Sequence, residues 1–459
     1  MILAVDIGST NLKAALFDKD GVRLSDASKP LPYAVHTSQI AELSAAAVAE
    51  CFFLVIKTAV SAALRRSEEI QTVAITSQAQ TFCICDGSEN PVSPFFGWAD
   101  CRAHEEASSL QEILGPRFHE RSGWPQVRPT HMISKALWWR KRYGLPEDHR
   151  IVSLPSFLAM RLGTDHSSDN NLAAMSGFYS IPTASWCAEA LDATGATPAQ
   201  LGGLVEPGRA IPTRCDYRPP GFSDSLKIVF AGNDHTAGAV GCGCSAGHPT
   251  LTLGTAGVLY RYAGEHPGPF SPAGLWGPYP GGGYYELLNI DHACSALDWA
   301  DEFLFGTVDS PRFVEQAKSA QIRATSPLFF PDKWGNAEAW SGDGCRAEKA
   351  YAVLEGIAFA MRLLASPRFR GSTERIAVLG GGCRLDYWMQ LVANVLGCML
   401  VRASCDGLDG AVVVSRKAQF SPLNSNEVFS PDLSSPDLLE LRFEHWRKLS
   451  PHPYLPVSL

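Results

Sequence analysis

The chain has 459 residues, a formal net charge of −8 and a pI near 5.9. This length allows roughly two to four domains. A composition that is 46% hydrophobic and 19% charged is that of a globular protein with a large buried core. An acidic chain without blocks of like charge argues against a nucleic-acid partner, which requires a clustered basic surface.

Residues 2–24 predict three strands joined by tight turns, because Asp20–Gly21 is a strong hairpin signal between two apolar runs. Next come a predicted helix over 40–66 and a buried strand over 71–78. The most apolar stretch, 45–64, contains Glu50 and Lys57 on one helical face, which favours a buried helix over a membrane span. We therefore expect no membrane partner.

The elements that follow predict a second half with its own strands and helices. Residues 131–162 predict two helices around a short strand, and a Pro-, Gly- and Ser-rich stretch over 205–225 predicts a domain junction. We accordingly divide the chain into domains 1–225 and 226–459. Beyond the junction we expect strands over 226–230 and 251–262, an irregular surface loop over 263–286, a helix over 347–365, and a strand, glycine turn and helix over 375–397.

The sequence contains thirteen cysteines, an odd number, in no disulfide framework or zinc pattern. We expect them to be buried, reduced thiols. Residues 1–8 carry Asp6 where a secretory signal would require apolar residues. The sequence therefore predicts a cytoplasmic protein.

Three glycine turns directly follow apolar strands, and consecutive backbone N–H groups in such turns bind phosphate. Hydroxyls in two of the turns and Lys13 nearby add donors. The segments around the first two turns have a similar sequence pattern, a Gly-Ser/Thr turn between two apolar runs, which suggests a duplicated domain. The turns are Gly8–Ser9–Thr10, Gly254–Thr255–Ala256–Gly257 and Gly380–Gly381–Gly382.

Two aspartates end strands beside these turns or beside other small residues. Asp6 would repel a phosphate unless a cation lay between them, which predicts a Mg²⁺ ion held mostly through water. Asp234, in the stretch AGNDHTAGAVG, can accept the proton of an attacking hydroxyl. An ordinary turn aspartate is the alternative for each.

Several of these stretches together resemble the FGGY carbohydrate kinases, most closely their xylulokinase-like branch. The resemblance spans nearly the whole chain and rests on blocks in the family order: VDIGSTNLKAALFD, TSQAQTFCICDGSENPVSPFFGWADCRA, AGNDHTAGAVG, LTLGTAGV, SALDWA, AVLEGIAFAM and VLGGGCRLDYWMQLVANVLG. It implies an α/β fold of two ribonuclease H-like domains of the actin/hexokinase type, with the active site in a cleft between a sugar-binding and a nucleotide-binding domain.

The resemblance also implies an ATP-dependent, Mg²⁺-assisted phosphorylation of a ketose, polyol or sugar acid. In this reading Asp234 is the catalytic base and a sugar ligand, and Asp6 holds Mg²⁺. The ATP ligands would be Gly8, Ser9, Thr10 and Lys13 with Gly254 and Thr255 around the phosphates, and Gly380, Gly381 and Gly382 beside the adenosine. His235 lies where relatives often carry an amide, and we expect it to have a structural role.

The sugar-binding block supplies five candidate ligands, each with a structural alternative. Gln78 and Gln80 alternate at a strand end, where they would either face the cleft or be solvated. Trp98, Asp100 and Arg102 also alternate, so they share one face. The Trp98 ring beside the Asp100 carboxylate would suit sugar binding. An Asp100–Arg102 ion pair with Trp98 in the core is the alternative, and the sequence favours neither.

The chain departs from the family at three places. Ala79–Gln80–Thr81 stands where xylulokinases usually have Met-His-Gly, and residues 329–340 and 406–414 replace two late family blocks. A catalytically degenerate, regulatory protein is therefore the alternative to an active kinase, although both aspartates and the glycine turns favour the kinase. A homodimer is the base-rate expectation for its assembly.

Overall fold

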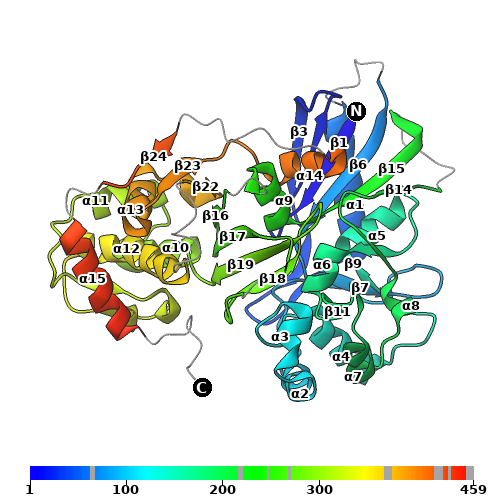
Figure 1. Cartoon of the computed structure of the whole chain (residues 1–459), viewed down its shortest axis with the longest axis horizontal. Coiled ribbons are helices and arrows are strands. Elements are labelled where there is room, and N and C mark those ends of the chain that lie inside the picture. The colour runs from blue at the N-terminus through cyan, green and yellow to red at the C-terminus, as the bar shows by residue number, and fades with distance from the viewer. Residues whose placement is uncertain are drawn as a thin grey trace.

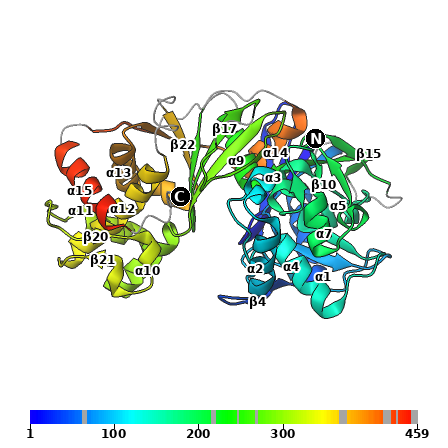
Figure 2. The ribbon, with the colours of Figure 1, turned by 60° about the horizontal axis from the view of Figure 1, so that its bottom comes forward.

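The computed structural model describes residues 1–61, 68–214, 221–244, 248–266, 270–365, 375–417, 427–432 and 436–450. Figures 1 and 2 show two bodies side by side, one formed by the N-terminal strands with α1 to α8 and the other by α10 to α13 and α15. The strands β16 to β19, which belong to the sheet of the second body, lie on the side of that body that faces the first. The late helix α14 (Gly407–Arg416) lies with the N-terminal strands in Figure 1.

The first body is built on a six-stranded sheet in the order β14-β15-β6-β1-β2-β3. β1 pairs in parallel with β6, and β6 with β15, while β2 and β3 continue the sheet as an antiparallel meander. The strands are β1 (Ile2–Ile7), β2 (Asn11–Phe17), β3 (Arg23–Pro30), β6 (Ile70–Ser77), β14 (Ala210–Pro212) and β15 (Phe222–Asn233).

The second body is built on a seven-stranded sheet in the order β18-β19-β17-β16-β22-β23-β24. β16 pairs in parallel with β22, and β22 with β23, while β17 and β19 form the antiparallel arm. The strands are β16 (Thr250–Leu253), β17 (Gly257–Gly264), β18 (Leu275–Pro278), β19 (Tyr284–Ile290), β22 (Arg375–Leu379), β23 (Met399–Arg402) and β24 (Val428–Phe429).

The two sheets share one topology. The run β3-β2-β1-β6-β15 and the run β19-β17-β16-β22-β23 have the same order and the same alternation of antiparallel and parallel pairs. The sequence similarity around the first two glycine turns therefore reflects a structural duplication, because the Gly8 turn joins β1 to β2 and the Gly254 turn joins the equivalent strands β16 and β17. The predicted α/β fold of two similar domains is confirmed.

Residue size decides which helices cover each face of the first sheet. Leu3, Val5 and Ile7 of β1 enter the core beneath α1 (Ala45–Ser61) and α5 (Leu154–Arg161). On the opposite face Ala4, with alanines of the neighbouring strands, contacts α9 (Asp234–Gly241) and α14. Since alanine leaves room for a close approach, these two helices pack tightly over the sheet.

The contact between α9 and α14 depends on glycine. A Cβ atom at Gly410 would lie 1.7 Å from the carbonyl oxygen of Ala237, and one at Gly241 would lie 3.0 Å from the backbone nitrogen of Gly410. The backbones of the two helices thus touch directly. Any side chain at Gly410 must push α14 away from α9.

We predict that Gly410→Ala lowers the free energy of unfolding by about 2 kcal/mol or more, as overpacking of a rigid contact does. Gly238→Ala, on the neighbouring helix, is the matched control. Its Cβ would meet only Leu379 Cδ2 at 3.9 Å, so the gain in helix propensity, up to ~1 kcal/mol, should appear. Urea denaturation measures both variants. Equal stability of Gly410→Ala and wild type would contradict the glycine contact.

Smaller elements build onto the first body. A five-stranded sheet runs β4-β5-β8-β7-β9, with β4 (Tyr33–His36), β5 (Ala41–Leu43), β7 (Phe82–Cys85), β8 (Phe95–Phe96) and β9 (Arg150–Ser153). The helices around it are α2 (His104–Leu114), α3 (Arg117–Ser122), α4 (Met132–Tyr143), α6 (Asn170–Met175), α7 (Ala188–Thr194) and α8 (Pro198–Leu201). Short strands link them: β10 (Ser167–Asp169), β11 (Tyr179–Ser180), β12 (Ser185–Trp186) and β13 (Gly203–Val205).

The second body has its own helical layer around a large apolar core. A fully buried ion pair joins Arg442 of its last helix to Glu355 of its longest one. Its helices and short strands are α10 (Cys294–Phe305), α11 (Ser310–Lys318), α12 (Arg346–Leu364), α13 (Asp386–Leu396), α15 (Pro436–Leu449), β20 (Leu328–Phe329) and β21 (Trp340–Ser341).

Two sequence predictions require revision. The junction at 225/226 falls inside β15, which pairs with β6 as part of the first sheet, so we propose a junction after α9 instead. The loop predicted over 263–286 was wrong where it includes β18 and the start of β19, whose Trp276 and Tyr285 are buried. Gly281, Gly282 and Gly283 form the turn between β18 and β19, whereas Gly277 and Pro278 belong to β18 itself.

Other predictions are confirmed in outline. The helix predicted over 40–66 is α1, which begins at Ala45, and the helices and strand expected over 131–162 are α4, β9 and α5. The cysteines that the structure describes are free, but only six of them are buried, so the expected burial was wrong for the others, among them the exposed Cys345. Among the described residues, we find no helix with the length and apolarity that crossing a bilayer requires.

Candidate active site

The predicted site residues of the first body meet at one sheet edge. The strand register aligns Ile7 of β1 with Ser77 of β6, and Ser77 with Asn233 of β15. Because these three parallel strands end together, the residues that follow them, Gly8, Gln78 and Asp234, emerge side by side. Open α/β sheets bind ligands at this edge.

Asp6 lies at the centre of this edge with little access to solvent. Its side chain is 11% exposed, and its Oδ1 atom has no hydrogen-bond partner within the described residues. Burial raises the pKa of Asp6 to about 7, with repulsion from Asp234 and Asp406 adding to the rise and the Lys13 ammonium opposing it. Lys13 Nζ lies 3.8 Å from Asp6 Oδ2. The two predicted carboxylates, Asp6 and Asp234, therefore act on one another electrostatically.

Asp234 is the first residue of α9. The side chain of Asn233 caps this helix by accepting a hydrogen bond from the His235 N–H at 3.1 Å, and Asp234 Oδ1 accepts from the same N–H at 2.9 Å. The small residues that follow allow α9 to pack closely against α14. A carboxylate in the first helical turn is favoured by the helix dipole and is half-buried here.

The first glycine turn lies beside an exposed aromatic ring. Gly8 N donates to Asn11 O at 3.0 Å, closing the turn, and the Tyr33 hydroxyl donates to Ser9 O at 3.0 Å. Tyr33 also interacts with Trp98. The side chain of Trp98 is 43% exposed, so it does not form part of the core.

The other two glycine turns meet at the edge of the second sheet. Thr252 pairs with Leu379, so the turns that begin at Gly254 and Gly380 are neighbours. A Cβ at Gly380 would lie 2.3 Å from Leu253 O, and one at Gly382 would lie 2.9 Å from Cys294 Sγ at the start of α10. The sequence predicted the turns themselves, but neither the pairing that makes these two neighbours nor the approach of α10.

Gly380 and Gly381 offer a matched pair for a test. Gly380 has φ +90° and no space for a side chain, whereas a Cβ at Gly381 would meet nothing within 4 Å. We predict that Gly380→Ala displaces the turn and raises KM for ATP by about 10-fold or more, while Gly381→Ala leaves it within about 2-fold. Steady-state kinetics measures both; equal values for the two variants would contradict a structural demand at Gly380.

The two glutamines of the sugar-binding block differ. Gln78 is buried, and neither polar atom of its side chain has a partner in the described part of the chain, so it remains a candidate sugar ligand. The Gln80 side chain accepts from Met132 N at 2.6 Å and donates to Met175 O. Because both ends of this amide are bonded to backbone, we correct its predicted role from sugar ligand to structural anchor.

Asp100 and Arg102 form the ion pair that the sequence left open. Asp100 has no exposed surface and accepts from Arg102 Nε at 2.8 Å and from Ala41 N at 3.0 Å. Arg102 Nη2 also bonds Glu42 at 2.6 Å. The pair thus fixes the loop that carries Trp98. These contacts revise the predicted sugar-binding role of both residues.

Lys135 is a neighbouring residue that the sequence analysis missed. Its ammonium group is buried and donates to Gln80 O at 3.0 Å and Gly97 O at 2.7 Å, and burial lowers its pKa to about 7. The residue ties the Gln80 turn to the segment before Trp98. The helical pattern of residues 131–143 did not indicate that Lys135 is buried, because the ammonium group of a single Lys on an apolar helix usually reaches solvent.

The start of α14 is a second part of the site that the sequence did not predict. Asp406 caps this helix through Leu408 N at 2.9 Å and accepts from Arg23 Nη1 of β3 at 3.2 Å. A Cβ at Gly407 would lie 3.3 Å from Asp6 Oδ2. The altered block 406–414 therefore forms an intact helix that closes over Asp6.

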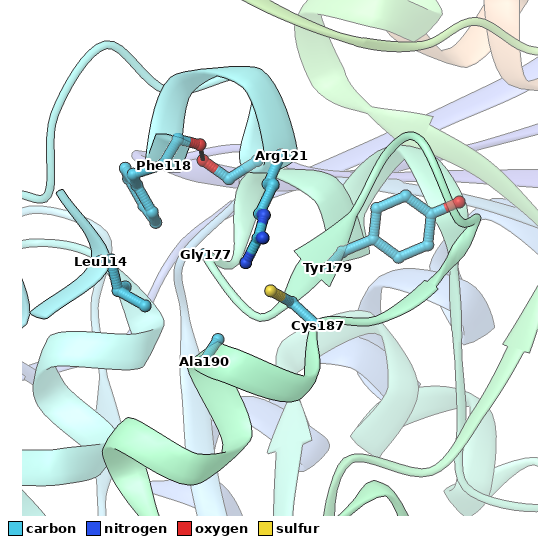
Figure 3. A pocket seen from close by; sticks show the side chains of 8 residues that line it. Leu114, Phe118, Arg121, Gly177, Tyr179, Cys187 and Ala190 are labelled. Atoms are coloured by element: carbon cyan, nitrogen blue, oxygen red, sulfur yellow. Dashed lines mark hydrogen bonds between the residues drawn. The ribbon is translucent and has the colours of Figure 1, made fainter. Parts of the chain in front are cut away.

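A separate small cavity lies in the first body, away from these residues. Figure 3 shows the Arg121 side chain and the Cys187 thiol beside each other within it, next to the Tyr179 ring. It contains none of the predicted site residues. Its lining consists of Leu114, Phe118, Arg121, Ser122, Gly177, Tyr179, Cys187 and Ala190.

The duplicated sheet, with glycine turns and carboxylates at its strand ends, places the chain among two-domain α/β enzymes of the actin/hexokinase type. Residues 1–241 match the FGGY family of carbohydrate kinases, N-terminal domain, and residues 250–412 match the C-terminal domain of the same family. The chain belongs to the FGGY family, and it is a carbohydrate kinase.

Individual relatives are distant. The chain is similar to xylulose kinase of Klebsiella pneumoniae, with 25% identity over 87% of this chain and 86% of the relative. It is also similar to gluconokinase of Bacillus subtilis (strain 168), with 23% identity over 86% and 82%. A crystal structure described as a xyloylose kinase from Brucella ovis superposes with a TM-score of 0.87 at 22% identity, covering 98% of both chains, which shows the common fold.

Proposed function

We propose that this carbohydrate kinase transfers the γ-phosphate of ATP to a hydroxyl of a small sugar, polyol or sugar acid, with Asp234 as general base. The observation that carries the proposal is that Asp6, Gly8 and Asp234 lie at the same edge of the first sheet, where the parallel strands β1 and β15 end on either side of β6. Phosphoryl transfer requires charge neutralisation and a positioned base more than covalent help from the protein. At this edge Asp234 would be the base, and Lys13, the backbone N–H groups of the Gly8 turn and a cation held by Asp6 would neutralise charge.

A Mg²⁺ ion is implied by the family, and the residues present fit one. Asp6 offers a buried oxygen without a partner in the described residues, and burial with repulsion from Asp234 and Asp406 raises its pKa even beside Lys13, which a bound cation would offset. Across the described ranges no three His, Cys, Asp or Glu side chains gather as a protein-only metal site, and Mg²⁺ typically binds one or two carboxylates plus phosphates and water. Asp6 would hold the ion, which when bound would neutralise charge on the phosphates.

The remaining steps belong to the chain's own residues. Asp234 would accept the proton of the sugar hydroxyl as that oxygen attacks phosphorus, and general-base help of this kind is worth roughly 10²–10⁴-fold. The backbone N–H groups of the Gly8–Thr10 and Gly254–Thr255 turns would orient the phosphates. Lys13 adds a positive charge beside Asp6. The Gly380–Gly382 turn would border the adenosine.

The sugar would lie between Asp234, Gln78 and the exposed ring of Trp98. Gln78 brings an amide without a partner among described residues, and Trp98 brings an apolar face. The named relatives include kinases of xylulose, gluconate and L-fuculose, so we propose a substrate of this class. The cytoplasmic location and the homodimer stay predictions.

ADP release by the purified protein with Mg-ATP tests this function across a panel of pentuloses, hexuloses, polyols and aldonates. One substrate well above the no-sugar background is the expected result. No ADP release above background with any compound of the panel, together with intact Mg-ATP binding measured by calorimetry, would favour the non-catalytic alternative. Because the chain keeps both Asp6 and Asp234, we do not propose that it is a catalytically degenerate, regulatory protein.

A further inference from the structure

Asn171, in α6, is a fully buried amide that contacts two separate parts of the chain, the start of α9 and the end of β18. Its Oδ1 atom accepts from Asn233 N at 2.8 Å and from Thr236 Oγ1 at 3.3 Å. Its Nδ2 atom donates to Pro278 O at 2.8 Å. None of these partners is near Asn171 in sequence.

The acceptor side of Asn171 holds the backbone directly before the proposed base. Gly232 has φ +81°, and a Cβ there would lie 2.9 Å from Asn171 Oδ1. The chain therefore turns against this amide before it reaches Asn233, which caps α9, and Asp234, which begins it. A shift of Asn171 must move the start of α9.

The donor side of Asn171 reaches the second sheet. Pro278 is the last residue of the edge strand β18. Thr236, which donates to Asn171, accepts in turn from the Tyr260 hydroxyl of β17 at 3.1 Å. One amide thus joins the first body, the helix of the base and the second sheet. Among uncharged side chains of this size, only an amide donates and accepts through separate atoms.

We propose that Asn171 is a positioning residue that couples the placement of Asp234 to the seating of the second sheet against the first body. The inference rests on the proposed role of Asp234. Kinases of hinged domains react when the two halves enclose the substrate. Through Asn171, a change at β18 is transmitted to the residue that begins α9. The base therefore reaches its working position together with the sheet that carries the two turns proposed to contact ATP, one at the phosphates and one at the adenosine.

The test is a double-mutant cycle between Asn171→Ala and Asp234→Asn, read as kcat with labelled ATP. Asn171→Ala alone should lower kcat by about 100-fold, as misplacement of a reacting group by an ångström does. In the Asp234→Asn background it should change the residual kcat by less than about 2-fold, because there is no base left to misplace. The number of ATP molecules bound per chain, measured by calorimetry, reports the folded fraction of each variant.

Asn170→Ala is the matched control, since Asn170 precedes Asn171 and its Oδ1 has no partner within the described ranges; it should retain wild-type kcat. If Asn171→Ala does not fold, Asn171→Ser enters the same cycle. Equal loss in both backgrounds would mean a merely structural role and would overturn the inference alone. A fully active Asp234→Asn would overturn the proposed function and this inference with it.

Discussion

Asp234→Asn is expected to lower kcat about 10³-fold while KM for ATP stays within about 2-fold. The amide has the shape of the carboxylate and keeps an acceptor for the His235 N–H, so the start of α9 is preserved. It cannot take up the proton of the sugar hydroxyl, and the loss of a general base costs roughly 10²–10⁴-fold. Steady-state kinetics on the substrate found in the panel measures both constants.

Asp224→Asn is the control for this substitution, because Asp224 is exposed on the same strand, β15. It removes the same charge from the chain and should leave kcat unchanged. Wild-type turnover by Asp234→Asn would contradict the assignment of the base. A large rise in KM for ATP with unchanged kcat would instead assign Asp234 to nucleotide binding.

Asp6→Asn is expected to lower kcat/KM for Mg-ATP by about 10²–10³-fold, the size of effect seen when a group that stabilises transition-state charge is removed. The fold should not suffer. Asp6 is desolvated and repelled by two other carboxylates, so an uncharged side chain of the same shape should keep or raise Tm, as happens at sites where function is held at the expense of stability.

Raising the Mg²⁺ concentration should partly restore the activity of Asp6→Asn, since the variant keeps an oxygen ligand but loses its charge. Asp20→Asn, at the exposed hairpin between β2 and β3, is the surface control. A variant with normal activity, or one that loses activity only because Tm falls steeply, would contradict the proposed role of Asp6.

The sequence predicted the parts of the fold that local pattern determines. Apolar runs before Gly8, Gly254 and Gly380 identified the strands that end at the site, and the repeated turn indicated the duplicated sheet. Such signals are local because a strand and its turn are specified by neighbouring residues. The meeting of Asp6, Gly8 and Asp234 was implied only by the family resemblance, because the sequence pattern assigned Asp234 to the second domain and did not predict β1, β6 and β15 as parallel strands of one sheet.

Contacts between segments that are distant in the sequence could not be predicted from local sequence patterns. Gln80, Asp100 and Arg102 have residue types suited to sugar binding, but their partners are Met132 N, Met175 O, Ala41 N and Glu42, which no local pattern reveals. The sequence likewise does not distinguish Asn171 from other helix residues, because its hydrogen bonds to Pro278 and Asn233 form only in the folded chain. Turn residues over 263–286 also concealed β18, because glycine and proline dominated the composition.

The most direct test of the central claim is to follow the phosphate itself. With Mg-ATP and the substrate found in the panel, ³¹P NMR coupled to the sugar protons shows where the γ-phosphate goes. We predict one sugar phosphate ester for each ADP, with the phosphate on a single hydroxyl, and no such signal with Asp234→Asn. ADP released with inorganic phosphate alone, or an ester formed equally well by Asp234→Asn, would contradict a sugar kinase that uses this base.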